Sequence, residues 1–375
     1  MKIAVNTRLL LKNKLEGIGW FSFETLKRIC IQHPEVEFVF IFDRQFDSEF
    51  IFADNVKPLI VSPPARHPFL FYTWFNISLP AALRKMKPDL YLSPDGYNCL
   101  PWKGKSLIVI HDLTFEARPQ DVPWLVKKYY HHFFPRFARK ASRIATVSEF
   151  SKSDIVARYH ISPDKIDVVC NGVNELFKPV DPEIFHNTRL KFTKGYPYFI
   201  FVGALHPRKN IDNLLLAFDT FKISDNQSIK LVIAGAKKWW TSEIRSAYEG
   251  MRFKDDVVFT GRLDDKSLHS LIGSALALTY VSHYEGFGIP ILEAFACGTP
   301  VITSNTSSMP EVAGDAAIYA DPASQTEIAA AMEQMATNRK LRSELIAKGF
   351  LRKNNYSWQK SADLLWNSIL KTLNE

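Results

Sequence analysis

The stretch ALALTYVSHYEGFGIPILEAFACG, residues 275–298, predicts a strand, a glycine-containing turn and a short helix in succession. Ala275–Ser282 has the continuous apolar character of a buried parallel strand. The helix is expected over Pro290–Cys297, with proline at its first position and Gly298 just past its end. This succession is typical of open α/β sheets, which bind ligands at the carboxyl ends of their strands.

Two glutamates bracket the turn with seven residues between them. Glu285 falls in the loop and Glu293 in the first helical turns, so we expect both carboxylates to face one crevice at the carboxyl edge of the sheet. Between them, Gly286 and Gly288 let the backbone come close to a ligand. The free N–H groups at the start of the helix favour an anion there.

Length and composition indicate a globular protein of two domains. The chain has 375 residues, of which 46% are hydrophobic and 23% charged. Its 47 basic and 39 acidic residues give a net charge of +8, which favours anionic partners such as nucleotide phosphates or acidic lipid, or serves solubility alone. Nucleic-acid binding has only this charge in its favour, and we predict none.

The cysteines and the amino terminus bear on location. No C-x-x-C pair occurs, which argues against a zinc site or a disulfide framework and fits a reducing compartment. We see neither a signal peptide nor an apolar run of membrane-spanning length. A cytoplasmic protein is therefore expected. The scattered cysteines are Cys30, Cys99, Cys170 and Cys297.

Alternating strand and helix patterns predict an α/β fold with two Rossmann-like, doubly wound domains. A ligand held between two such domains would lie in the cleft where they face each other. The first is expected over residues 1–178 and the second over 179–357, since 174–197 is poor in both patterns. The predicted strands are Lys2–Arg8, Glu37–Asp43, Asp89–Pro94, Ser106–Leu113, Arg143–Glu149, Ile166–Val173, Tyr198–Leu205, Ile229–Gly235, Val257–Gly261, Ala275–Ser282, Pro300–Asn305 and Ala317–Ala320.

Two cations follow the first strand of the second half. The strand ends at Gly203, Arg208 and Lys209 come next, and an amphipathic helix begins after Asn210. Two cations beside a helix start, at the carboxyl end of a strand, can neutralise a diphosphate. A lone Arg-Lys pair is more often a solvated surface, but the nearby glutamate segment favours the diphosphate site.

In the first half, His111 comes at the end of a buried strand, where it could hydrogen-bond a sugar hydroxyl. A single histidine there is more often structural than catalytic. Gly17 and Gly19 follow the first strand and permit close backbone approach, although the third glycine of a dinucleotide-binding fingerprint is missing.

Residues 127–140 interleave basic and aromatic side chains and contain no acid. Such a helix suits an anionic membrane surface or a lipid-linked acceptor. A core helix whose cations extend to the solvent explains the same composition.

Taken together, the motifs resemble those of retaining GT-B glycosyltransferases of family 4, the large group with bacterial mannosyl- and glucosyltransferases. The resemblance covers nearly the whole chain. The motifs that carry it are Gly17–Gly19, Val109–Asp112, Val147–Lys152, Asn171–Val173, Gly203 with Arg208–Asn210, Phe259–Gly261, the two glutamates and Gly298–Val301.

This resemblance implies roles for individual residues. Glu285 would contact the donor sugar and Glu293 the ribose, while Arg208 and Lys209 would bind the diphosphate. His111 would face the transferred sugar. The remaining donor-binding positions would be Gly17, Gly19, Gly203, Gly261, Gly286, Phe287 and Gly288.

The same resemblance implies transfer of a hexose, mannose favoured, from a nucleoside-diphosphate sugar such as GDP-mannose to a glycan or lipid-linked glycan in polysaccharide, lipopolysaccharide or O-antigen synthesis. It implies no cofactor, no metal, and a tail helix, 358–375, packed on the first domain. The composition of 127–140, by itself, predicts peripheral contact with the inner membrane face. A nucleotide-sugar epimerase of the same architecture and a non-catalytic nucleotide-sugar binding protein remain alternatives.

Overall fold

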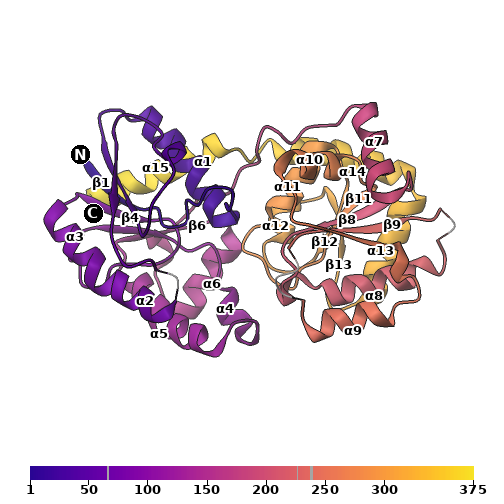
Figure 1. The fold of residues 1–375 in the computed structure, drawn as a ribbon, viewed down its shortest axis with the longest axis horizontal. Coiled ribbons are helices and arrows are strands. Elements are labelled where there is room, and N and C mark those ends of the chain that lie inside the picture. The colour runs from indigo at the N-terminus through magenta and orange to yellow at the C-terminus, as the bar shows by residue number, and fades with distance from the viewer. Residues whose placement is uncertain (66, 226, 237–239) are drawn as a thin grey trace. The chain divides into compact units, whose positions relative to one another are not determined.

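The computed structural model describes residues 1–65, 67–225, 227–236 and 240–375, which divide into two compact units (Figure 1). The first unit comprises Met1–Asn171 and Trp358–Glu375, and the second comprises Gly172–Ser357. The division thus precedes the boundary at 178 that the sequence suggests. The reason is that the following segment already packs on the second unit, where the Lys178 carbonyl oxygen lies 2.7 Å from His269 Nε2.

The first unit is built on a sheet of seven strands in the order β3-β2-β1-β4-β5-β6-β7, all parallel. Six of them match predicted strands. The sequence analysis missed β3 because Pro58 interrupts its pattern, and the strand lies at the sheet edge, where proline is tolerated. The strands are β1 Lys2–Asn6, β2 Glu37–Phe42, β3 Val56–Ile60, β4 Leu90–Ser93, β5 Ser106–Val109, β6 Arg143–Thr146 and β7 Ile166–Val168.

Several strands end sooner than predicted. β1 stops at Asn6 and β5 at Val109, so Arg8 and His111 lie in the loops that follow. The residues directly after these strands, such as Thr7 and Ile110, are as buried as strand residues. They nevertheless leave the hydrogen-bonded ladder and form the carboxyl edge of the sheet.

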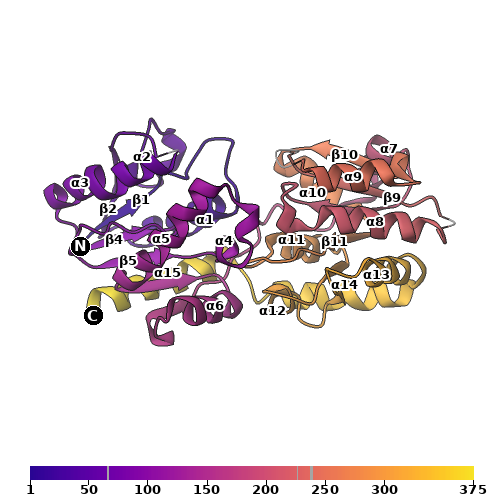
Figure 2. The ribbon, with the colours of Figure 1, turned by 90° about the horizontal axis from the view of Figure 1, so that it is seen from below.

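Seven α-helices surround this sheet among the described residues. The tail helix α15 lies beside α1 (Figure 2), and the rings of His33 and Trp366 stack between them at 3.7 Å. Ala362, Leu365 and Ile369 of α15 are fully buried. The helices are α1 Gly17–Gln32, α2 Pro68–Thr73, α3 Leu79–Met86, α4 Thr114–Ala117, α5 Trp124–Lys140, α6 Glu149–Tyr159 and α15 Trp358–Asn374, with single turns at Ser48–Phe50, Pro119–Asp121 and Pro163–Lys165 and a π-helical turn at Trp74–Ser78.

The second unit contains a sheet of six parallel strands in the order β10-β9-β8-β11-β12-β13. Each corresponds to a predicted strand. The strands are β8 Tyr198–Val202, β9 Lys230–Ala234, β10 Val257–Gly261, β11 Ala277–Tyr280, β12 Val301–Ser304 and β13 Ala317–Ala320.

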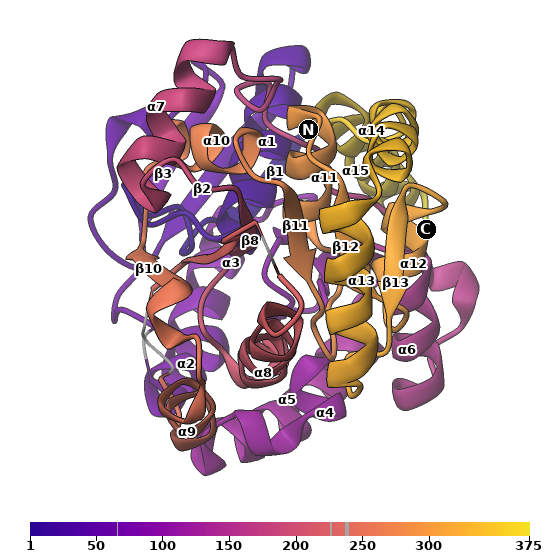
Figure 3. The ribbon, with the colours of Figure 1, turned by 90° about the vertical axis from the view of Figure 1, so that its right-hand side faces the viewer.

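Helices cover this sheet too, and Figure 3 shows α8 and α13 packed side by side. The apolar face of α8 buries Leu214, Leu215 and Phe218 completely, as its helical spacing predicts. The helices are α7 Pro182–Thr193, α8 Ile211–Lys222, α9 Ser242–Gly250, α10 Asp265–Gly273, α11 Ile289–Cys297, α12 Met309–Ala313, α13 Gln325–Thr337 and α14 Arg339–Lys353, with single turns at Pro207–Lys209 and Lys254–Asp256.

Both sheets are doubly wound. In the first, the chain moves outward from β1 through β2 to β3 and then returns to β4 on the other side of β1. In the second, it moves from β8 through β9 to β10 and returns to β11 beside β8. Each sheet therefore has a point where the strand order reverses, and open α/β sheets bind ligands outside the carboxyl ends of the strands at such points.

Candidate functional site

The loops after β8 and β11 meet where the strand order of the second sheet reverses. A backbone hydrogen bond joins them, because the His283 N–H donates to the Arg208 carbonyl oxygen at 2.9 Å. The site predicted from the sequence thus has its two halves, the basic pair and the glutamate segment, on adjacent strands.

The loop after β8 is held rigidly. Asn210, fully buried with φ of +62°, donates to the carbonyl oxygens of Val281 at 2.9 Å and Pro322 at 2.7 Å. His206 Nδ1 accepts from the Arg208 N–H at 3.3 Å and caps the single turn Pro207–Lys209. These contacts fix the backbone that carries the two cations.

Both cations pair with one carboxylate. Arg208 Nη1 lies 2.5 Å from Glu285 Oε2, and Lys209 Nζ lies 2.5 Å from Glu285 Oε1. Glu285 is only 5% exposed. Burial by itself would raise the pKa of this carboxyl, but the charges of Arg208 and Lys209 outweigh burial and lower the pKa to about 2. The cluster therefore carries one surplus positive charge.

Tyr280 completes this cluster, and the sequence analysis did not single it out. Its hydroxyl accepts a hydrogen bond from Lys209 Nζ, and the same Nζ lies 4.6 Å from the centre of its ring. Burial, and then the charge of Glu285, raise the pKa of Tyr280, so it stays a neutral phenol. Tyr280 is the last residue of β11, and only the pairing of β8 with β11 brings it to Lys209.

The turn between the glutamates is supported from behind. Ser308 Oγ donates to the carbonyl oxygens of Glu285 at 2.9 Å and Phe287 at 3.1 Å. Phe287 is buried and its ring contacts that of Tyr356, so its backbone and not its side chain is the part available to a ligand. Gly288 has φ of +101°, which explains the glycine there.

Glu293 lies apart from the cations, within α11. Burial, and then the negative charge of Asp265, raise the pKa of Glu293 to about 8, opposite to the shift of Glu285. Two carboxyls of one motif therefore have different protonation at neutral pH, which agrees with separate tasks for them.

Gly203 and Gly261 lie at the same edge of the sheet, at the ends of β8 and β10. Both have positive φ, +145° and +72°. A Cβ on Gly261 would meet no atom within 4 Å, whereas a Cβ on Gly203 would come within 3.7 Å of the Lys209 side chain. Gly261 therefore faces open space.

His111, Gly17 and Gly19 belong to the first unit. His111 Nε2 lies 2.8 Å from the Pro94 carbonyl oxygen, which can only accept, so Nε2 bears the proton. Burial lowers the pKa of His111, and the neutral ring keeps Nδ1 as a hydrogen-bond acceptor. The glycines lie in the first turns of α1 and not in an extended loop.

The two glycines of α1 differ. A Cβ on Gly19 would approach the Leu9 carbonyl oxygen to 3.2 Å, so the close backbone approach predicted there is to the chain's own preceding loop. A Cβ on Gly17 would meet nothing within 4 Å. Only Gly17 leaves room for a ligand.

The first sheet has its own ion pair where its strand order reverses, which the sequence analysis also missed. Arg8 Nε lies 2.5 Å from Asp95 Oδ2, and both side chains are almost completely buried. Asp95 Oδ1 accepts from Asn6 at 2.9 Å and Ser93 at 3.0 Å. The guanidinium lies over three rings, those of Phe71, Phe75 and Tyr97.

Two searches of the described residues complete this account. Within 1–65, 67–225, 227–236 and 240–375, no group of three or more His, Cys, Asp or Glu side chains is placed to hold a metal ion. In the same residues, no helix has the length and apolar character needed to cross a membrane.

Comparison with known protein families gives two matches. The model for glycosyl transferases group 1 matches residues 183–352, and that for glycosyltransferase family 4 matches residues 34–175. The chain is 29% identical to the O-antigen chain mannosyltransferase B of Escherichia coli over 376 aligned positions, which cover 96% of this chain and 97% of that protein.

Solved structures share the fold. A sucrose-phosphate synthase from Thermosynechococcus elongatus superposes with a TM-score of 0.76 at 16% identity, covering 99% of this chain and 98% of that one. Alr3699/HepE from Anabaena, in complex with UDP-glucose, superposes with a TM-score of 0.77 at 14% identity, covering 99% and 100%. With the two parallel-sheet units, these similarities confirm the predicted GT-B fold.

Proposed function

Because the chain belongs to glycosyltransferase family 4, we propose that it is a retaining hexosyltransferase that uses a nucleoside-diphosphate sugar, with mannose favoured as the sugar. The acceptor is a glycan or lipid-linked glycan in polysaccharide or O-antigen assembly. Full-length similarity to an O-antigen chain mannosyltransferase supports mannose, and hence GDP-mannose as donor.

One observation carries the proposal: two cations face a single carboxylate where the strand order of the second sheet reverses. When the bond between sugar and diphosphate breaks, negative charge develops on the leaving group and the sugar becomes oxocarbenium-like. Fixed cations lower this barrier electrostatically. Arg208 and Lys209 are therefore assigned to the diphosphate and Glu293 to the ribose.

Retention of configuration is explained if the acceptor hydroxyl attacks the sugar from the same face as the departing diphosphate. A phosphate oxygen of that leaving group takes the acceptor's proton. No protein nucleophile is assigned, and Glu285 binds the donor sugar. Glu285 Oε1 has no well-aligned hydrogen bond among the described residues, which leaves it capacity to accept from a sugar hydroxyl. The neutral His111, with Nδ1 as acceptor, suits the role of facing the transferred sugar.

We propose that the enzyme needs no metal, because Arg208 and Lys209 supply the positive charge that a divalent cation would otherwise supply. No cofactor is assigned. The donor glycines are Gly17, Gly203, Gly261, Gly286 and Gly288, together with the backbone of Phe287. Gly19, which lies against the Leu9 carbonyl oxygen, is not among them.

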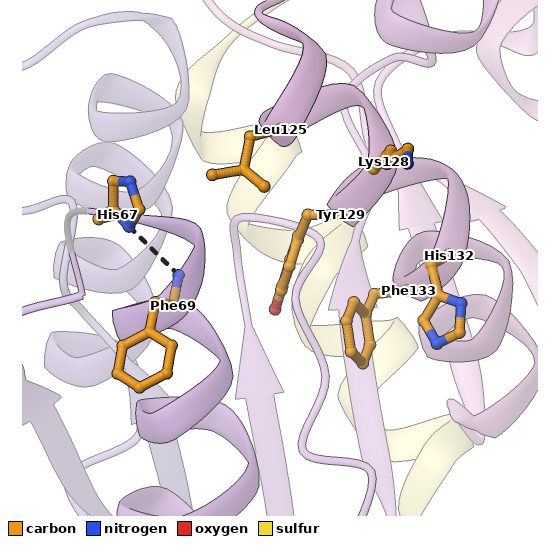
Figure 4. Close-up of a pocket in the computed structure, with 7 residues that line it drawn as sticks. All are labelled: His67, Phe69, Leu125, Lys128, Tyr129, His132 and Phe133. Atoms are coloured by element: carbon orange, nitrogen blue, oxygen red, sulfur yellow. Dashed lines mark hydrogen bonds between the residues drawn. The ribbon is translucent and has the colours of Figure 1, made fainter.

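For the acceptor side, we propose that the first unit contacts an anionic membrane through α2 and α5. An open groove of about 600 Å³ lies between these helices. Figure 4 shows the residues that line it. Phe69 and Trp124 are 71% and 66% exposed, and Lys128 Nζ lies 4.0 Å from the Trp124 ring centre. The groove is lined by His67, Phe69, Leu125, Lys128, Tyr129, His132 and Phe133.

The core interpretation of residues 127–140 holds for one side of α5, and we propose the membrane contact for the other. Tyr129, Phe134 and Phe137 of α5 are buried in the core, while the opposite side presents cations and no acid. Exposed aromatic rings beside lysines favour the boundary between lipid headgroups and acyl chains. This surface is the reason for proposing that the protein binds the inner membrane face, which stays a prediction.

Vesicle sedimentation tests the membrane surface. Phosphatidylglycerol vesicles are expected to retain the protein and phosphatidylcholine vesicles to release it, with Phe69→Ser and Trp124→Ser each weakening retention severalfold. Leu351→Ser, which removes a side chain 72% exposed on the second unit, is the matched control and should have no effect. Equal losses in all three variants would contradict the proposal.

The function itself is tested with a panel of nucleoside diphosphates. A ligand that binds the native state raises its apparent stability, so thermal unfolding should identify the base. The matching labelled sugar donor is then offered with glycan acceptors. Acceptor-dependent transfer with retained configuration is expected, whereas epimerised donor without transfer would establish the epimerase, and binding without turnover the non-catalytic protein.

A further inference from the structure

We propose that Glu285 is the resident counter-ion of the donor site: it pairs with both Arg208 and Lys209 until a diphosphate displaces it, with Tyr280 as the positioning residue for Lys209. The inference rests on the proposed function and adds an exchange step to it. The diphosphate takes over the cations, and the released carboxylate becomes available to the donor sugar.

The contacts of Glu285 favour such an exchange. Each oxygen of Glu285 contacts a different cation at 2.5 Å, so the carboxylate spans both positions that a diphosphate needs. A diphosphate that approaches Arg208 Nη1 and Lys209 Nζ competes with Glu285 for the same two nitrogens. A carboxylate and a phosphate side by side would also repel each other in this partly buried site.

Charge leads to the same conclusion. Arg208, Lys209 and Glu285 together sum to +1, from two cations and one carboxylate. The diphosphate of a nucleotide sugar brings two negative charges, which match the two cations only if Glu285 has moved away. Its oxygens are then free for neutral sugar hydroxyls, which cannot compete for the cations as phosphate does.

Only the side chain of Glu285 has to move. Its N–H lies 3.2 Å from Ser307 Oγ, and its carbonyl oxygen accepts from Ser308 Oγ at 2.9 Å, so the backbone is fixed on both sides. The carboxylate, by contrast, is held by ion pairs, and Oε1 has no well-aligned hydrogen bond among the described residues. A rotation about side-chain bonds is sufficient for the exchange.

Tyr280 keeps Lys209 in place during the exchange. Its hydroxyl accepts from Lys209 Nζ, and the centre of its ring lies 4.6 Å from the ammonium. Tyr280 is 1% exposed and stacks on Phe201, so it cannot follow a departing carboxylate. When Glu285 leaves, these contacts to Tyr280 hold Lys209 where the diphosphate arrives.

Titration calorimetry with GDP, UDP and inorganic pyrophosphate tests the exchange. Glu285→Gln removes the competing charge and keeps the shape, so the best-binding diphosphate is expected to bind roughly tenfold more tightly or better, while sugar transfer falls. Glu285→Asp keeps the charge and should not bind more tightly. Glu333→Gln, an exposed acid of α13, is the control for net charge.

The outcomes separate the two proposals. If the unaltered protein binds no nucleoside diphosphate, the proposed function fails. If it binds one and Glu285→Gln binds it no more tightly, only the exchange is refuted. A crystal of the unaltered protein with that diphosphate gives an answer that does not depend on how the variant folds: both contacts of Glu285 should lengthen beyond about 4 Å, and contacts retained at 2.5 Å would overturn the exchange.

Tyr280→Phe tests the positioning role, since it removes the hydroxyl and keeps the ring. We expect kcat to fall about fivefold to tenfold with donor KM changed less than twofold. In a double-mutant cycle on diphosphate affinity, Tyr280→Phe and Glu285→Gln should be non-additive because both side chains contact Lys209 Nζ. Additive effects, or a change confined to thermal stability, would show a merely structural tyrosine.

Discussion

The two sheets each place an ion pair where their strand order reverses, but the two pairs differ in charge balance. In the first sheet one cation, Arg8, meets one carboxylate, Asp95, and their side chains are 8% and 4% exposed. In the second, Arg208 and Lys209 share Glu285, and the Arg208 side chain is 24% exposed.

Hydrogen bonding separates the pairs further. Asp95 accepts from Asn6, Ser93 and the Tyr97 N–H in addition to Arg8, so its oxygens are fully used. A buried pair of one cation and one carboxylate whose oxygens accept several hydrogen bonds is costly to break and needs no further partner. A cluster with one more cation than carboxylates, and a carboxylate oxygen without a well-aligned hydrogen bond, is suited to a ligand.

The largest effect is expected from breaking the balanced pair. Asp95→Asn leaves the buried Arg8 without its counter-charge and should lower the free energy of unfolding by about 3–5 kcal/mol. Equilibrium urea unfolding measures this loss. Lys12→Ala, which breaks an exposed pair with Asp47 in the same unit, should cost only about 0–1 kcal/mol. A loss from Asp95→Asn as small as that of the control would remove the distinction between the two sheets.

Removing one cation from the unbalanced cluster should affect chemistry more than folding. Arg208→Ala or Lys209→Ala is expected to lower kcat for sugar transfer by roughly 10²–10³-fold, because charge on the leaving diphosphate is then less well stabilised. Steady-state kinetics with the identified donor measure it, and Lys340→Ala, 89% exposed, is the control. Near-native turnover in both variants would count against the leaving-group role.

Glu293 should make nucleotide binding depend on pH. With its pKa raised to about 8, the carboxyl is largely protonated at neutral pH, and accepting from two ribose hydroxyls requires loss of that proton. Affinity for the nucleoside diphosphate should therefore rise between pH 7 and 8.5, by at most about tenfold per pH unit. Calorimetry at several pH values checks this, and Glu293→Gln should bind more weakly and without the pH dependence.

The same shift has the opposite consequence for stability. The unfolded chain releases the Glu293 proton near its ordinary pKa of 4.5, while the folded protein keeps it to about 8. The contribution of Glu293 to the free energy of unfolding is thus present below pH 4.5 and declines as pH rises towards 8. A urea titration series that shows no difference from Glu293→Gln across this range would contradict the raised pKa.

The smallest expected effect is that of a chelator. EDTA should leave transfer unchanged if Arg208 and Lys209 supply the positive charge that we propose for them. Activity lost with EDTA and recovered with magnesium would show that the two cations are not sufficient.

The sequence was enough to predict the fold because a buried parallel strand is apolar on both faces, as Tyr198–Val202 and Ala277–Tyr280 are. Strand ends were less accurate, since Ile110 after β5 is as buried as the strand itself. β3 was not predicted because it is an edge strand whose residues are mostly exposed and include a proline.

The basic pair and Glu285 were predicted as site residues from local motifs, and the structure brings these three into contact. Tyr280 and Asp95 could not be found that way. Each meets its cation across neighbouring strands, 71 and 87 residues away in the chain, and a tyrosine ending a strand or an aspartate after one has no local signature. These two residues could have been predicted only if the pairing of β8 with β11 and of β1 with β4 had been known.

The placement of α15 has a consequence for biosynthesis. Trp358–Asn374 covers β4, β5 and β6 in addition to α1, so the first sheet lacks part of its covering layer until the ribosome has translated residues 358–374. The second unit, by contrast, is complete in the nascent chain once Ser357 has emerged from the exit tunnel. Most of the first unit is therefore synthesised before the second unit, but its fold can be completed only after that of the second unit.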